Sequence, residues 1–239
     1  MAGAEEKVGS RAAGLRFLGI VAALLPAPAA AGAWVAPQRQ TIVTATVGAH
    51  EDGGEYYESA LYFEEPLGRR TSVVVTPWSE WDDETEDGWR GEAFAGVKRV
   101  IREREGRVTA LQVGAVWVSQ PDWEVCSEGG VEGRVLDGYS FAEGRAFLNV
   151  ETSSRALVGG CFGGRLDVTA GYRPSERWLA TGQVFYDAPV AREETVKAQV
   201  SLVRFDAHGR GWQIGLRATL NGDDAAPALV VGLWQSSRD

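Results

Sequence analysis

Cysteine, histidine and methionine are scarce in this chain of 239 residues, which contains two cysteines, two histidines and one methionine. No C-x-x-C pair occurs, and neither cysteine has a histidine close to it in the sequence. Because protein metal sites are built from several such ligands at short spacing, we expect no metal site and no cofactor. Basic residues are in deficit, with 24 Lys and Arg against 33 Asp and Glu, so we expect no nucleic-acid partner.

Long apolar runs are missing after the N-terminal region, which excludes ordinary transmembrane helices, since these need about 20 apolar residues. The N-terminal region itself is typical of a secretory signal peptide. Its features are Arg11, Arg16, the short apolar run 15–25, Pro26, Pro28 and a string of alanines with small-x-small exits at Ala31 or Ala33. We therefore predict a cleaved signal peptide over residues 1–31 and one exported domain over residues 32–239.

The exported part favours β-strands. It is rich in glycine and tryptophan, which suit tight turns and strands better than helices. Over residues 212–220 every second side chain, from Trp212 to Leu220, is apolar, while the intervening ones are mostly polar. Such alternation places the two sets on opposite faces of a sheet.

Extending this pattern along the chain predicts twelve strands, with ten as the alternative count. They are expected at 40–50, 56–65, 70–80, 91–102, 107–118, 130–139, 144–153, 163–173, 177–187, 195–206, 211–221 and 227–235. The connections alternate between tight turns, such as 65–70 and 174–176, and longer loops, such as 80–90, 119–129 and 154–162. Short turns at one end and longer loops at the other are typical of an outer-membrane β-barrel, whose termini lie at the periplasmic end.

Tryptophans fall at or near the predicted strand ends, where the lipid headgroup region favours amphipathic rings. These are Trp78, Trp81, Trp89, Trp117, Trp178, Trp212 and Trp234. A core or loop position is the alternative for each of them.

Several features together resemble the outer-membrane β-barrel class of Gram-negative bacteria. They are the leader, the alternating strands of about ten residues, the strand Arg165 to Arg173 followed by Pro174 and the strand from Trp178, and the closing segment Leu229 to Trp234. The resemblance implies an all-β, antiparallel, up-and-down transmembrane barrel in the outer membrane. Such barrels usually end on an aromatic residue, whereas this chain continues past Trp234 to Asp239.

Mid-strand charges on the polar faces would project into the lumen of such a barrel. The expected lining residues are Glu132, Arg134, Arg145, Glu151, Arg165, Asp167, Lys197 and Arg217. Charges of both signs would suit a passive, porin-like channel for small charged solutes. A non-conducting surface or structural barrel and a soluble periplasmic β-sandwich are the two alternatives.

Cys126 and Cys161 are expected in two long loops on the same side of the barrel, flanking one predicted hairpin. We predict a disulfide between them, in preference to two free thiols. His50 and His208 fall at opposite ends of a barrel more than 20 Å tall and cannot share one site, so we expect no catalytic residues and no enzyme.

Charge is distributed unevenly between the two sets of connections. The longer loops carry mostly acids, including those of the run 80–87, while the tight turns carry arginines such as Arg69, Arg104 and Arg177. The acidic run lacks the ligand spacing of a calcium-binding EF-hand loop. The expected partners are outer-membrane lipid, lipopolysaccharide and the outer-membrane assembly machinery; the sequence does not define the oligomeric state or the substrate.

Overall fold

The computed structural model describes residues 32–50, 54–82, 88–119, 126–189, 194–221 and 227–237. The predicted signal peptide, residues 1–31, lies outside these ranges. The strands are β1 (Gln40–Ala49), β2 (Glu55–Gly68), β3 (Thr71–Asp82), β4 (Trp89–Arg104), β5 (Arg107–Val118), β6 (Gly129–Phe141), β7 (Ala146–Leu157), β8 (Cys161–Ser175), β9 (Trp178–Ala188), β10 (Thr195–Phe205), β11 (Gly211–Thr219) and β12 (Pro227–Ser236). None of the described residues forms a helix that is long and apolar enough to cross a membrane.

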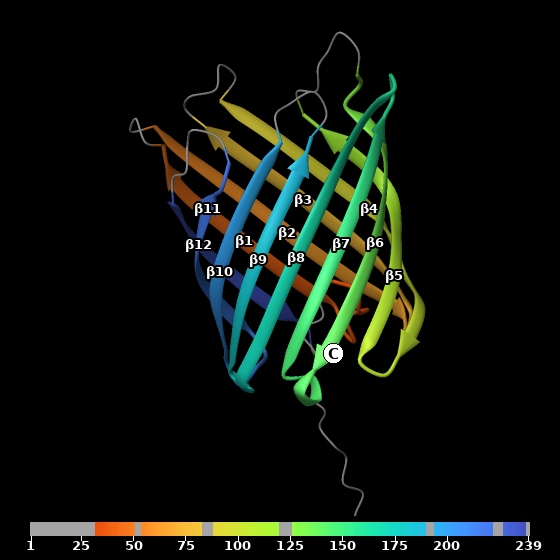
Figure 1. Ribbon diagram of the computed structural model, residues 1–239, viewed down its shortest axis with the longest axis vertical. Coiled ribbons are helices and arrows are strands. Elements are labelled where there is room, and N and C mark those ends of the chain that lie inside the picture. The colour runs from red at the N-terminus through yellow and green to blue at the C-terminus, as the bar shows by residue number, and fades with distance from the viewer. Residues whose placement is uncertain are drawn as a thin grey trace, which may run out of the picture.

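All twelve strands form one closed antiparallel barrel in which each strand pairs with its neighbours in sequence. The barrel closes where β1 pairs with β12, in a register that joins Gln40 to Ser236 and Gly48 to Ala228. Figure 1 shows the strands tilted against the barrel axis, with the C-terminal end of the chain near the tight turns. The predicted fold and the count of twelve strands are confirmed, and the alternative of two packed sheets is wrong, since a single sheet closes on itself.

The two faces of the sheet differ sharply in character. Apolar side chains point outward and are solvent-exposed: Val113 and Val200, for example, expose 65% and 63% of their surface. Their neighbours on the same strands, Gln112 and Gln199, are buried on the inner face. Because a dry core between two sheets would show the reverse arrangement, the outer surface resembles that of a barrel embedded in lipid.

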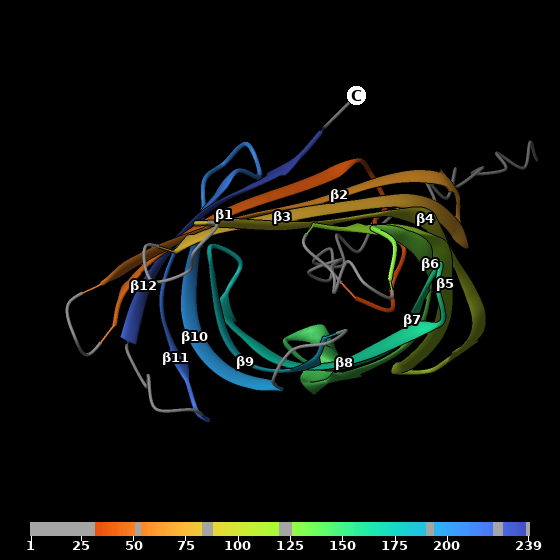
Figure 2. The same ribbon diagram turned by 90° about the horizontal axis from the view of Figure 1, so that it is seen from above.

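The barrel is flattened. Viewed along its axis in Figure 2, β1 to β4 form one broad side, and β8 to β10 lie opposite them. At one corner, where β4 pairs with β5, Gly96 and Gly114 are register partners. A Cβ atom added at Gly114 would lie 2.2 Å from the carbonyl oxygen of Ala95, so the two strands approach more closely here than side chains allow.

Aromatic side chains gather on the outer surface at both ends of the barrel. We call the end with the tight turns the turn end, and the other the loop end. Trp81, Trp89 and Trp117 are exposed at the loop end, and Trp178 and Trp212 at the turn end, as predicted. Trp78 and Trp234 differ from this pattern because their register places them on the inner face. The rings of Trp89 and Trp117 lie 6.2 Å apart.

The turn end follows the predicted pattern, with a short 3-10 turn, η1 (Ala142–Gly144), between β6 and β7. The loop end departs from it at one place. The connection predicted as a long loop over residues 154–162 is a turn of residues 158–160, because β7 continues to Leu157 and β8 begins at Cys161. Thr152 and Ser154 interrupt the apolar alternation on the outer face without ending the strand, which explains the wrong boundary.

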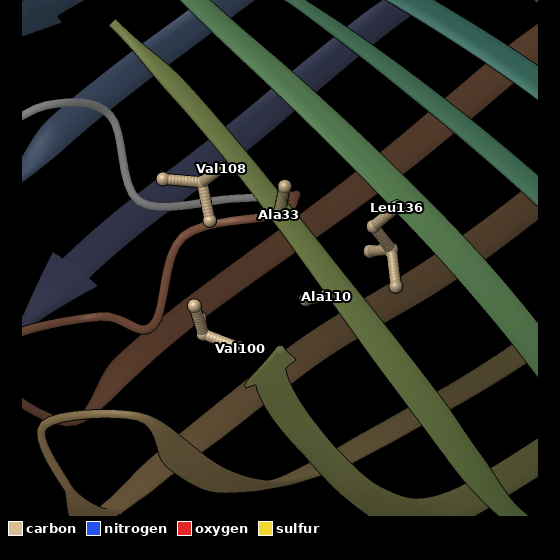
Figure 3. Close-up of a cluster of buried hydrophobic side chains, with 5 residues drawn as sticks. All are labelled: Ala33, Val100, Val108, Ala110 and Leu136. Carbon is tan, nitrogen blue, oxygen red and sulfur yellow. The ribbon is translucent and has the colours of Figure 1, made fainter. Parts of the chain in front are cut away.

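The segment that precedes β1 lies inside the barrel. Figure 2 shows it in orange, within the ring of strands. Ala33 is fully buried in an apolar cluster with Val100, Val108, Ala110 and Leu136, from β4, β5 and β6 (Figure 3). The lumen at the turn end is therefore filled in part by the chain itself.

Candidate functional site: the charged lumen

Two groups of ion pairs cross the lumen, and the first is centred on Glu58 of β2. Its carboxylate contacts Lys197 of β10 at 2.5 Å and also pairs with Arg217 of β11. Lys197 lies 3.8 Å from Glu80 of β3, which pairs with Arg90. Because β1 and β12 lie between β2 and β11, these contacts connect strands that are not neighbours in the sheet.

The second group is centred on Glu92 of β4. Its two carboxylate oxygens contact Arg155 of β7 at 2.9 Å and Arg165 of β8 at 3.3 Å. Arg165 also contacts Asp187 of β9 at 2.9 Å, and Arg155 contacts Glu132 of β6 at 3.1 Å. The strands β5 and β6 lie between β4 and β7, so this group also spans the interior.

Arg134 extends the second group along the wall. Its guanidinium contacts Glu132 at 2.5 Å and Glu151 of β7 at 2.7 Å. The same guanidinium lies 4.5 Å from the centre of the Phe94 ring, a distance at which a cation and an aromatic face attract each other. The side chain is thus fixed from three directions.

A separate ion pair lies at the turn end, next to the segment that precedes β1. Lys98 of β4 and Glu64 of β2 contact each other at 2.9 Å, and both side chains are completely buried. Lys98 also donates hydrogen bonds to the carbonyl oxygens of Gly32 and Trp34, at 2.9 and 2.8 Å. A buried charge is tolerated only with such partners.

Most of the residues that were expected to line the lumen do so. Glu132, Arg134, Glu151, Arg165, Lys197 and Arg217 all belong to the first two groups of ion pairs. Asp167 also faces inward, directly opposite Glu151 in the register of β7 and β8. Arg145 is different: it lies between η1 and β7 and is exposed at the turn end. The strand predicted from residue 144 begins only at Ala146.

The sequence reading missed the carboxylates on which the crossing ion pairs converge, Glu58 and Glu92, and the buried Arg155. Arg155 falls in the connection predicted over residues 154–162, and the strand predicted over 56–65 contributes no expected lumen residue. The sequence does contain a signal for their position. Glu58 and Glu64 are evenly spaced along β2, as Glu92 and Lys98 are along β4, so each pair lies on one face of its strand. Alternation gives the face of a residue but does not identify its partner across the lumen.

Cys126 and Cys161 form the predicted disulfide, with their Cα atoms 5.9 Å apart. Cys126 precedes β6 and Cys161 opens β8, so the bond spans the hairpin of β6 and β7 at the loop end. Val116 and Leu157 pack with Cys126 in a small buried cluster. The bond therefore joins the base of a loop to the barrel wall.

The two histidines lie at opposite ends of the barrel. His50 follows β1 at the loop end, 3.3 Å from Asp82, and His208 lies in the turn between β10 and β11. In that turn the amides of Arg210 and His208 donate hydrogen bonds to Asp206, which lower the pKa of its carboxyl group. Within the described ranges, no group of three or more His, Cys, Asp or Glu side chains could hold a metal ion.

Known protein families and curated protein sequences give no match to this chain. Solved structures do match its fold. The KdgM porin in complex with disordered oligogalacturonate has a TM-score of 0.60 and 7% identity, over 83% of this chain and 99% of that one. The NanC porin has a TM-score of 0.56 and 10% identity, over 84% and 100%. An outer-membrane channel from Pseudomonas putida F1 has a TM-score of 0.55 and 9% identity, over 86% and 98%. The chain thus shares the fold of porins and channels.

Proposed function

We propose that this protein is a non-enzymatic outer-membrane barrel whose lumen passes small charged solutes passively. The outward-facing apolar side chains between two aromatic belts support a position in lipid. Oligogalacturonate is bound by one of the porins that share the fold, which supports transport as the role. The turn end would face the periplasm.

One observation carries the proposal: fixed charges of both signs project into the lumen and reach across it. Glu58 and Glu92 each hold two cationic side chains from strands that are not their neighbours in the sheet. Such groups replace part of the hydration shell of an ion and create local fields that small charged solutes sense. Neutral solutes of the same size would gain nothing from them.

Purified protein in planar lipid bilayers tests this proposal. We expect stepwise conductance whose ion selectivity shifts toward cations when Arg165→Gln or Arg217→Gln removes a positive charge from the lumen. Arg204→Gln is the matched control, because Arg204 is exposed on the outer face of β10 and stacks on Trp178. Silent bilayers with correctly folded protein would contradict the channel.

A non-conducting structural barrel is the second candidate. The observation that favours it is the same set of crossing ion pairs, which also fastens the two broad sides of the barrel together. On this alternative the Arg165→Gln and Arg217→Gln variants would lose thermal stability, and no variant would conduct. The bilayer recordings above therefore distinguish the two candidates.

A further inference from the structure

Residues 32–36, which we call the lumenal segment, occupy the turn end of the barrel interior. Their backbone is held by side chains of three separate strands. Lys98 of β4 donates to the carbonyl oxygens of Gly32 and Trp34. Asn149 of β7 accepts a hydrogen bond from the amide of Ala33 at 3.0 Å. Glu64 of β2 accepts one from the amide of Ala36 at 3.2 Å.

Packing on the wall complements these hydrogen bonds. Ala33 exposes none of its surface and contacts the inner face of β4, β5 and β6, as Figure 3 shows. Trp34 lies against β6 at Gly138, where an added Cβ atom would come within 2.5 Å of the indole ring. Glycine at this position therefore makes room for Trp34.

The Lys98 and Glu64 pair explains how the segment can be bound in the lumen and still leave it. Each of the two charges keeps the other as a partner whether or not the segment is present, and Lys98 also lies 3.3 Å from the hydroxyl of Tyr62. The two carbonyl oxygens contributed by the segment can be replaced by water, because the lumen is polar. Departure of the segment then leaves no unpaired buried charge.

We propose that the lumenal segment is a removable plug, which narrows the lumen at the turn end and widens it on leaving. This inference rests on the proposed channel function and adds a regulatory element to it. The plug blocks the part of the flattened interior bounded by β2 and by β4 to β7. The ion pairs of Glu58 lie beyond it, toward β10 and β11.

Two variants of the full chain release the plug by different routes. Gly138→Leu fills the place of the Trp34 ring, and Asn149→Ala removes the acceptor for the Ala33 amide. Gly133→Leu is the matched control, because it makes the same change on the outward face of β6, where an added Cβ atom meets nothing within 4 Å.

Hydrogen–deuterium exchange of residues 32–36 measures the attachment, and single-channel conductance measures the block. We expect slow exchange in the wild type and in Gly133→Leu, and exchange faster by roughly tenfold in the two releasing variants. We also expect a larger unitary conductance in the releasing variants only.

The two measurements separate the plug from the channel. Rapid exchange in the wild type would overturn the attachment of the segment. Faster exchange in the variants with an unchanged, measurable conductance would overturn the plug and leave the channel intact. If neither the wild type nor any variant conducts, including those with a released segment, the channel is contradicted and the plug with it.

Discussion

Glu58 illustrates how much a single lumenal residue controls. It is almost fully buried on β2 and is shared by Lys197 of β10 and Arg217 of β11. Glu58→Gln preserves the shape of the side chain, but it leaves Arg217 without an acid and Lys197 with only the more distant Glu80. We expect selectivity to shift toward anions and the free energy of unfolding to fall by up to about 3 kcal/mol. Reversal potentials in a salt gradient and urea unfolding in lipid vesicles measure the two effects.

The control for this prediction is Glu65→Gln. Glu65 lies further along β2, on the outer face near the turn end, and pairs with Arg39 there. Because exposed ion pairs contribute about 0–1 kcal/mol, this variant should change neither selectivity nor stability by much. Equal shifts in both variants would mean that the position of Glu58 in the lumen is unimportant.

At the residue scale the sequence predicted which face of the sheet a residue occupies better than it predicted which side chains pair across the lumen. Seven of the eight residues expected in the lumen face it, because period-two alternation follows directly from strand geometry. Arg145 failed because strand ends are not marked by alternation. The pairing of Glu92 with Arg155 and Arg165 could not be predicted, since it depends on the flattening of the whole barrel.

Among the elements, the hairpin of β6 and β7 depends on the disulfide between Cys126 and Cys161. The bond closes a sequence separation of 35 residues, for which chain entropy gives a stabilisation of about 4 kcal/mol. We expect reduction, or the Cys126→Ser and Cys161→Ser double variant, to lower the temperature at which the folded band disappears in heat-modifiability gels. Reductant should have no further effect on the double variant, and any effect there would contradict the assignment.

The corner between β4 and β5 makes a second prediction at this scale. Gly114→Ala places a methyl group against the backbone of Ala95 and Gly96, and we expect it to destabilise the barrel by about 1–3 kcal/mol. Gly182→Ala on β9 is the control, because a Cβ atom there has nothing within 4 Å. Urea unfolding in vesicles compares the two, and equal stabilities would show that the corner is not tightly packed.

Element boundaries were predictable where turn residues and alternation agreed. β5 occupies the predicted range 107–118, between a tight turn and the longer loop that precedes β6. β7 does not, because Thr152 and Ser154 give its outer face a polar stretch near the loop end. The position of the lumenal segment could not be predicted: residues 32–36 belong to the predicted exported domain but to none of its predicted strands, and only the closed barrel brings them to Lys98 and Asn149.

For the whole molecule, the closing strand β12 turns its aromatic side chain into the barrel interior. Trp234, the last aromatic residue of the chain, points into the lumen, where its indole nitrogen donates to Gln213 at 2.7 Å and its ring meets Phe205 edge-on. It is therefore engaged in the barrel interior and does not present an outward aromatic at the end of β12.

Whether the whole barrel is embedded in lipid can be tested through its stability. Val200 lies at the middle of β10 and exposes 63% of its surface, and Leu220, 60% exposed, follows β11 at the loop end. In a lipid-embedded barrel an arginine near the bilayer midplane costs about 2–4 kcal/mol, whereas one near the interface costs about 0–1 kcal/mol. We therefore expect Val200→Arg to destabilise the protein far more than Leu220→Arg, as measured by equilibrium unfolding from lipid vesicles. In water both arginines would be solvated equally. Similar stabilities for the two variants would therefore show that the outer face of the barrel is not embedded in lipid.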